Sequence, residues 1–208
     1  MSFKYWLPDE NGQKTEYETQ DNAVIIIGAN GSGKSKLGAW IECQNFDGVH
    51  RVGAQRNLNF NENIPLKNYS EAENWVFYGS GDGNDHSKGQ RWNWGHYTTR
   101  LMDDYDSVLA AVIALKNNEI SKFHQECKDR GNNKAEWPDT PVTSIDKIQH
   151  IWKSVFPQRE LIEDDSKFYA GLYKNGEFNK YSATEMSDGE RAVLYLAAQV
   201  LSVPKIKC

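Results

Sequence analysis

The sequence has few cysteines, no long apolar run and no strong excess of either charge. Its three cysteines, Cys43, Cys127 and Cys208, form no C-x-x-C pair, which argues against a disulfide framework and fits a reducing compartment. No stretch approaches the roughly 18 apolar residues of a membrane helix, and the first residues lack the pattern of a signal peptide. We therefore expect a soluble, cytoplasmic protein without a membrane partner.

The charge and the length limit the function class further. The net charge of −5 comes from 24 Lys and Arg against 29 Asp and Glu, interspersed along 208 residues. Such a chain has no basic field that attracts nucleic acid or membranes non-specifically. Its length suffices for one α/β domain with a substantial core, or for a compact domain that carries one inserted lobe.

One motif stands out near the N-terminus. The segment Gly28-Ala29-Asn30-Gly31-Ser32-Gly33-Lys34-Ser35 matches the phosphate-loop pattern G-x-x-x-x-G-K-[ST] at every position. The glycines let successive backbone N–H groups converge on phosphate oxygens, and the helix that follows adds the positive end of its dipole. Lys34 supplies a charge for the β- and γ-phosphates, and the Ser35 hydroxyl ligates Mg²⁺. The motif predicts an ATP and Mg²⁺ site; the alternative is a Gly-rich turn without a ligand.

The flanks of this loop fit an α/β core. Ala23 to Ile27 is a β-branched run without polar alternation, which predicts a strand buried on both faces of a parallel sheet. Apolar residues at helical spacing predict a helix from Lys34 to about Cys43. They are Leu37, Trp40 and Ile41. Further strands are expected at His50 to Leu58 and Trp75 to Tyr78.

Hairpins and helices are predicted elsewhere along the chain. Asn-Gly pairs predict hairpins between residues 3–7 and 15–18 and between residues 168–173 and 177–181. Helical spacing marks residues 101–113, 145–155 and 192–201. The expected fold is α/β, a P-loop NTPase core with an N-terminal β-hairpin and an inserted helical lobe. Residues 1–90 would form the first half of the core, residues 91–165 the lobe, and residues 166–208 the second hairpin, a motif and its helix.

That second motif is Ser187-Asp188-Gly189-Glu190 at the start of the last predicted helix. It can be an ordinary capping box, because Ser at the N-cap and Glu three residues later satisfy two orphan backbone donors. Ser-x-Gly-Glu at a helix mouth is also a second surface suited to anions. Both interpretations stay open at this point.

The two motifs and their order resemble the ATP-binding-cassette ATPases, whose signature Ser-Gly-Gly-Gln precedes a helix. Asp188 and Glu190 vary that signature as in the chromosome-maintenance, recombination and overcoming-lysogenization-defect branches. The layout is also similar to the ATPases of bacterial anti-phage cassettes. The resemblance implies a head-to-tail homodimer in which Ser187 and Gly189 contact ATP held by the partner copy, and a nucleotide state that controls a partner effector protein or DNA. It also implies that Gln55, which precedes Arg56, could ligate Mg²⁺; a structural amide is the alternative.

One part of such an ATPase is missing from the sequence. No apolar strand ends in the Asp-Glu pair that supports Mg²⁺ and activates water. The place to expect it follows residues 192–201, so the core is expected to be incomplete at its C-terminal end. A truncated gene or fragment, a stand-alone binding module and a split enzyme would each explain this. Alternative functions are a P-loop nucleotide or small-molecule kinase and a non-catalytic nucleotide-sensing module.

Overall fold

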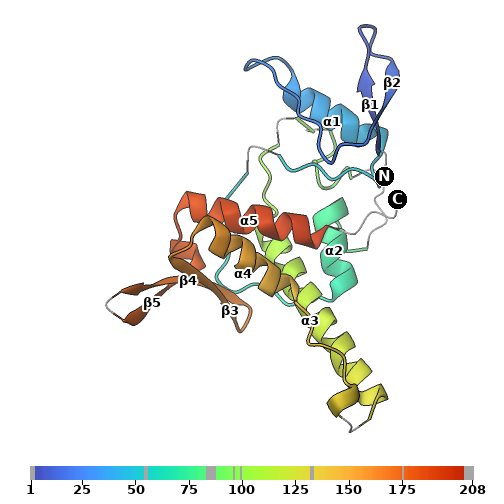
Figure 1. The fold of residues 1–208 in the computed structure, drawn as a ribbon. Coiled ribbons are helices and arrows are strands. Elements are labelled where there is room, and N and C mark those ends of the chain that lie inside the picture. The colour runs from blue at the N-terminus through green and yellow to red at the C-terminus, as the bar shows by residue number, and fades with distance from the viewer. Residues whose placement is uncertain are drawn as a thin grey trace.

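The computed structural model describes residues 3–53, 56–82, 88–95, 97–98, 100–131, 134–174 and 176–203. This part of the chain forms a mixed α/β fold with two small antiparallel sheets and five α-helices (Figure 1). The strands are β1 Phe3–Pro8, β2 Lys14–Thr19, β3 Arg159–Asp164, β4 Lys167–Lys174 and β5 Glu177–Ser182. The helices are α1 Lys34–Gln44, α2 Tyr69–Tyr78, α3 Tyr105–Asp129, α4 Ser144–Val155 and α5 Asp188–Ser202, with the 3₁₀ turns η1 Lys134–Glu136 and η2 Ala183–Glu185.

The N-terminal hairpin forms as the Asn-Gly pair predicts. Asp9 closes the turn, because its Oδ1 accepts hydrogen bonds from the N–H groups of Asn11 at 2.9 Å and Gln13 at 2.7 Å. Gly12 has a φ of +76°, the left-handed region that glycine adopts without steric cost. The β1–β2 hairpin and α1, with the connecting residues 20–33, are referred to below as the N-terminal unit. It lies at the top of Figure 1.

The second sheet has the order β3-β4-β5. The β4–β5 hairpin confirms the second Asn-Gly prediction, although Asn175 itself lies outside the described residues. Strand β3 was not predicted. It joins β4 through Asp165 and Ser166, which have φ values of +50° and +62°. Such a two-residue turn is usually marked by Asn-Gly or Asp-Gly, so Asp-Ser gives a weaker signal.

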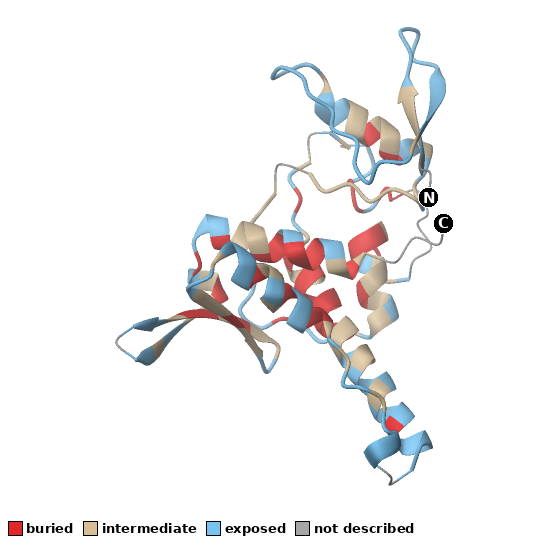
Figure 2. Cartoon of the chain, in the orientation of Figure 1, coloured by how far each residue is buried: buried red, intermediate tan, exposed pale blue. Residues whose placement is uncertain are grey.

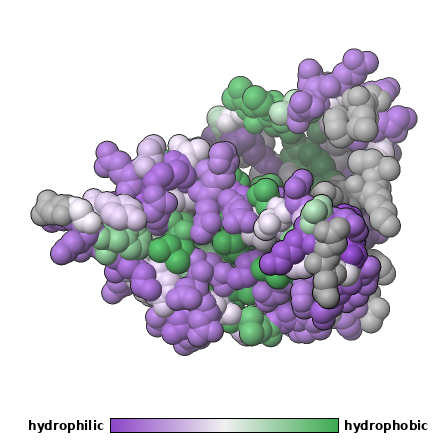
Figure 3. All heavy atoms as spheres, turned by 60° about the horizontal axis from the view of Figure 1, so that its bottom comes forward, coloured by the Kyte–Doolittle hydropathy of each residue, from purple (hydrophilic) through white to green (hydrophobic). Residues whose placement is uncertain are grey.

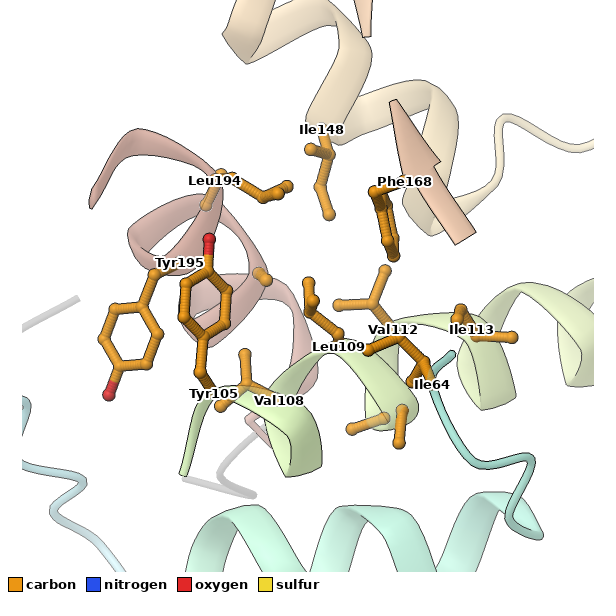
Figure 4. Close-up of a cluster of buried hydrophobic side chains, with 14 of the residues drawn as sticks. Ile64, Tyr105, Val108, Leu109, Val112, Ile113, Ile148, Phe168, Leu194 and Tyr195 are labelled. Carbon is orange, nitrogen blue, oxygen red and sulfur yellow. The ribbon is translucent and has the colours of Figure 1, made fainter. Parts of the chain in front are cut away.

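The hydrophobic core lies where α3, α4 and α5 meet α2 and the second sheet. Figure 4 shows Leu109 and Val112 of α3 pointing toward Leu194 of α5, Ile148 of α4 and Phe168 of β4. All five side chains are at most 2% exposed. The buried residues gather in these helices, whereas the N-terminal unit is largely exposed (Figure 2). The helices predicted at 145–155 and 192–201 are confirmed as parts of α4 and α5. The helix predicted at 101–113 also forms, but α3 begins only at Tyr105 and continues to Asp129.

The predicted strand at Trp75 to Tyr78 is wrong, because these residues form the end of α2. The Asn68 side chain caps the start of this helix by accepting a hydrogen bond from the N–H of Glu71 at 2.8 Å. Gly79 ends the helix in the left-handed conformation. These two caps outweigh the strand preference of the aromatic residues between them.

The predicted buried strand at Ala23 to Ile27 is also wrong. The segment belongs to no strand, and Val24, Ile25, Ile26 and Ile27 are 48%, 82%, 45% and 91% exposed. The upper part of Figure 3, where the N-terminal unit lies, shows hydrophobic residues at the surface. A strand forms only when neighbouring strands take up its backbone hydrogen bonds. Within the described residues, every strand already belongs to one of the two antiparallel sheets, and neither includes this segment.

The predicted strand at His50 to Leu58 is not formed either. In its described residues the ladder is reduced to one isolated parallel bridge between Arg56 and Met102. The N–H of Asn57 donates to the carbonyl of Met102 at 2.7 Å. This segment therefore runs as an irregular connection that brings the N-terminal unit to the core.

Candidate nucleotide-binding site

The phosphate loop curls back on itself before it enters α1. Gly31 and Gly33 have φ values of +83° and +90°, a conformation that favours glycine. The N–H of Ser32 donates to the carbonyl of Ala29 at 3.1 Å, and the N–H of Leu37 donates to the carbonyl of Gly33 at 2.9 Å. The loop is therefore a tight turn that leads directly into the first turn of the helix. The predicted helix after the motif is confirmed.

The N-terminus of α1 has donors but no cap. Its N-cap residue is Gly33, so no side chain can accept a hydrogen bond from the first turn, and that turn contains no acidic residue. The first N–H groups of a helix have no partner inside the helix. In the described part of the chain, the N–H groups of Lys34, Ser35 and Lys36 make no hydrogen bond, and all three residues are exposed. These amides and the helix dipole give this end of α1 a positive potential.

A pocket of about 440 Å³ lies on this loop. Seven consecutive residues line it, Asn30 to Lys36. Both side chains that the motif assigns to phosphate and Mg²⁺ chemistry, Lys34 and Ser35, therefore line the pocket together with the uncapped amides. The remaining motif residues, Gly28 and Ala29, do not line the pocket but contact Lys34 through their carbonyl oxygens.

The Lys34 ammonium is fixed above the loop. Its Nζ donates to the carbonyls of Gly28 at 2.6 Å and Ala29 at 2.7 Å. A lysine ammonium has three N–H donors, so one remains after these two bonds. A phosphate in the pocket would receive that third hydrogen bond or draw the flexible side chain away from the carbonyls. The residues present thus fit a phosphate group, and the Ser35 hydroxyl beside them fits a hard cation such as Mg²⁺.

The start of α5 is closed by its own side chains. The Ser187 hydroxyl donates to Oε2 of Glu190 at 2.7 Å, and the same oxygen accepts from the Ser187 N–H at 3.0 Å. The N–H of Glu190 donates back to the Ser187 Oγ at 3.4 Å. This capping box was one of the two interpretations of the motif, and it is confirmed. Ser187 and Gly189 are exposed, and a Cβ on Gly189 would meet no atom within 4 Å, so a partner could reach this turn.

Glu190 connects the capping box to the neighbouring strands. Its side chain is 5% exposed and also accepts hydrogen bonds from Tyr181 and from Arg159, which forms a salt bridge with it. Burial raises the pKa of this carboxyl, but the hydrogen bonds from Tyr181 and Ser187 outweigh burial, and the pKa lies below its usual range. Glu190 therefore stays ionised and ties α5 to β3 and β5.

A buried charged cluster joins α1 to the rest of the molecule. Glu42, on α1, is fully buried and lies 3.1 Å from Arg51, 3.5 Å from Lys88 and 3.7 Å from Arg91. Arg91 also lies 3.7 Å from Asp104, which precedes α3 and accepts a hydrogen bond from Gln199 of α5. The cluster thus connects the helix of the phosphate loop to α3 and α5 through charge-assisted contacts.

Burial lowers the pKa of two side chains in this region. It lowers the pKa of His50 to about 3, helped by the neighbouring Arg91, and it lowers the pKa of Lys88 to about 8 against the attraction of Glu42. His50 Nε2 lies 2.8 Å from the Gln199 amide oxygen. His50 is therefore neutral at pH 7, where it adds no charge to a region that already holds three cations.

Sequence reasoning did not find this cluster. Hydrophobic spacing points to the face of α1 that carries Leu37, whereas the residues that are buried on this helix are Ala39 and Glu42. A charged residue on a buried face leaves no periodic signal. Of the predicted site residues, Gln55 lies outside the described residues. The structure does not bring Ser187 and Gly189 to the pocket on the phosphate loop, which Asn30 to Lys36 line.

The described residues contain no group of three or more His, Cys, Asp or Glu side chains arranged to hold a metal ion. No helix among them combines the length and the apolar character needed to cross a membrane.

Comparison of the chain with protein-family models, with curated proteins and with solved structures finds no match.

Proposed function

We propose that this protein binds ATP with Mg²⁺ in the pocket on the phosphate loop. The observation that carries the proposal is the uncapped start of α1, where free backbone amides, the Lys34 ammonium and the Ser35 hydroxyl meet at one pocket. Backbone amides at a helix N-terminus bind phosphate oxygens, and a lysine and a hydroxyl at these two positions serve the β- and γ-phosphates and the metal ion.

Each group has a separate task in this proposal. The free amides of Lys34, Ser35 and Lys36 at the start of α1 bind the phosphates, and the Lys34 ammonium neutralises part of their charge. Ser35 ligates Mg²⁺, which keeps most of its remaining ligands as water and phosphate oxygens. Gly28 allows the loop to close, because a Cβ at this position would lie 2.6 Å from the Ser32 hydroxyl. Bound Mg²⁺ would supply charge neutralisation between the β- and γ-phosphates.

We further propose that the chain is the N-terminal portion of a cassette-type P-loop ATPase that dimerises around ATP. Support comes from Ser187 and Gly189, which lie exposed at the start of α5. In the view of Figure 1, α1 and α5 run in the same general direction, with both N-termini on the left. A second copy, placed head to tail, would bring its Ser187 and Gly189 to the ATP of the first and let nucleotide state control a partner protein or DNA.

Calorimetric titration of ATP with Mg²⁺ tests the binding proposal. We expect Lys34→Ala to weaken ATP binding by about 100-fold, because it removes a charged hydrogen-bond donor from the phosphates. The matched control is Lys122→Ala, which removes an exposed lysine from α3 and should leave the affinity within about twofold. Equal affinity of Lys34→Ala and the unmutated chain would refute nucleotide binding at this loop.

Two substitutions at one position test dimerisation. Ser187→Ala and Ser187→Arg both remove the cap of α5, but only the arginine adds bulk at the surface where a partner's ATP would lie. We expect both variants to bind ATP as monomers, Ser187→Ala to dimerise more weakly because it lacks the hydroxyl, and Ser187→Arg to fail to dimerise with ATP in sedimentation analysis. Dimers that persist in Ser187→Arg would leave Ser187 with the capping role alone.

A further inference from the structure

A second, smaller pocket shares Ser35 with the pocket on the phosphate loop. Its volume is about 180 Å³. Apart from Ser35 of α1, the described lining residues come from the connection after α1 and from the segment before α3, and they include two arginines and no acidic residue. They are Ser35, Arg51, Gly53, Trp92, Tyr97, Thr98 and Arg100. Because Ser35 lines both pockets, the two cavities adjoin at the residue proposed to ligate Mg²⁺.

The two arginines of this pocket differ in what they already contact. The Arg51 guanidinium already has partners. Its Nε lies 3.1 Å from Glu42, and its Nη2 donates to the Tyr97 carbonyl. It also lies 3.7 Å from the centre of the Trp92 ring. Arg100 is half-buried, and in the described part of the chain its guanidinium makes no hydrogen bond and no ion pair. A guanidinium has five N–H donors, so Arg100 keeps its full capacity to bind an anion.

The surroundings explain why Arg100 has no partner among the residues that the structure describes. Arg100 also borders a neighbouring pocket that includes Asp103 and Asp104. Those carboxylates are used elsewhere: Asp103 accepts from Asn57 at 3.0 Å, and Asp104 accepts from Tyr195 at 2.7 Å and from Gln199 at 2.9 Å. Another buried donor also lacks a partner, the indole Nε1 of Trp92, whose side chain lines the smaller pocket.

We infer that Arg100 is a further nucleotide-contacting residue, which binds the terminal phosphate of a triphosphate whose other phosphates lie on the phosphate loop. The inference rests on the proposed ATP binding. A triphosphate is an extended chain of anions, so a chain that fills the loop pocket and passes Ser35 enters the smaller pocket with its last phosphate. Arginine suits that phosphate because its planar guanidinium forms paired hydrogen bonds with phosphate oxygens. Arg100 thereby makes the site prefer ATP to ADP.

The test compares ATP and ADP, each with Mg²⁺, by calorimetry on the same variants. We expect Arg100→Ala to weaken ATP binding by about 10-fold to 100-fold, the effect of losing a charge-assisted hydrogen bond. ADP binding should stay within about twofold, because ADP does not reach the smaller pocket. Arg100→Lys should restore part of the ATP affinity, since lysine keeps the charge but not the paired geometry. Arg130→Ala is the matched control, because Arg130 lies at the other end of α3.

The outcomes separate this inference from the proposed function. If Lys34→Ala loses both nucleotides while Arg100→Ala keeps the ATP-to-ADP preference of the unmutated chain, binding at the loop stands and the role of Arg100 is overturned. An equal loss of ATP and ADP in Arg100→Ala also overturns that role, because it shows a structural effect. If Arg100→Ala does not fold, the ratio of ATP affinity to ADP affinity is measured for Arg100→Gln and Arg100→Lys instead. Failure of the unmutated chain to bind either nucleotide removes both proposals together.

Discussion

The helices α1 and α5 begin in opposite ways, although both carry the same partial positive charge at their N-terminus. At α5, Ser187 and Glu190 close a capping box, and both Asp188 and Glu190 lie in the first turn. At α1 the N-cap is Gly33, the first turn has no acidic residue, and no side chain accepts from it. The difference shows that a helix N-terminus can have either of two roles. A helix start that is satisfied internally stabilises the fold, whereas one left open, with a lysine beside it, can receive an anion.

The packing of the two helices differs in the same sense. Helix α5 places Leu194 and Ala198 in the core with no exposed surface. Helix α1 buries only Ala39 and Glu42, and it reaches the core through the charged cluster around Glu42. Stability is therefore concentrated at α5 and candidate binding chemistry at α1. The predictions below test this contrast.

The largest expected effect comes from opening the closed helix start. Glu190→Gln removes the charge that accepts hydrogen bonds from Ser187 and Tyr181 and pairs with Arg159. We expect the free energy of unfolding to fall by about 2 to 3 kcal/mol, because several hydrogen bonds to a buried carboxylate lose their charge. Urea denaturation measures this loss.

The matched control is Glu185→Gln, which changes an exposed residue of the turn η2 and for which we expect a change within about 0.5 kcal/mol. Equal losses in the two glutamine variants would mean that the capping box and the Arg159 pair add nothing to stability.

The next effect probes the contacts between the buried cluster and α5. Because the pKa of His50 is about 3 in the fold and the ordinary value is 6.5, the unfolded chain takes up a proton first as the pH falls. The contribution of neutral His50 is complete above pH 6.5 and is lost progressively between pH 6.5 and 3. At pH 5 this loss amounts to about 2 kcal/mol.

We expect His50→Gln to flatten the dependence of unfolding free energy on pH between 7 and 5. His150→Gln is the control, since His150 is an exposed residue of α4. Denaturant titrations across this range measure both curves. If His50→Gln and His150→Gln follow the same curve as the unmutated chain, His50 does not couple the pH to the contact with Gln199.

The smallest effects come from the same substitution at the two helix starts. Gly33→Ala puts a Cβ on a residue with a φ of +90° and should cost about 1 to 2 kcal/mol. Gly189→Ala meets open space within α5 and should stabilise by about 0.5 to 1 kcal/mol, the difference in helix propensity. Thermal unfolding gives the sign of each change. Two changes of the same sign would show that the starts of α1 and α5 are conformationally alike.

Long, strongly periodic segments were the part of the fold that the sequence could predict. Helices α3, α4 and α5 bury many apolar residues at regular spacing, so their pattern dominates local preferences. The turn residues that predicted the two hairpins act through the two or three residues beside them, and both hairpins formed. The phosphate loop also follows from local spacing, because its glycines and the following helix are contiguous.

Features that depend on distant neighbours could not be predicted. The β-branched run at Ala23 to Ile27 has a strand's composition, yet composition does not supply the strand that must pair with it. Helix α2 was missed because the caps at Asn68 and Gly79 decide its limits more than the aromatic residues inside it. The Arg100 guanidinium has no partner among the described residues because Asp103 and Asp104 accept hydrogen bonds from other segments. A sequence motif does not show such contacts between distant residues.

The exposed run from Val24 to Ile27 affects how the protein behaves in solution. Its four β-branched side chains expose apolar surface to water directly upstream of the phosphate loop, and removing this surface from water is favourable. Ions that are excluded from protein surfaces, such as sulfate, strengthen apolar association. The chain should therefore salt out at lower concentrations of ammonium sulfate than a variant with serines at Ile25 and Ile27, and purification in chloride buffers should keep it dispersed.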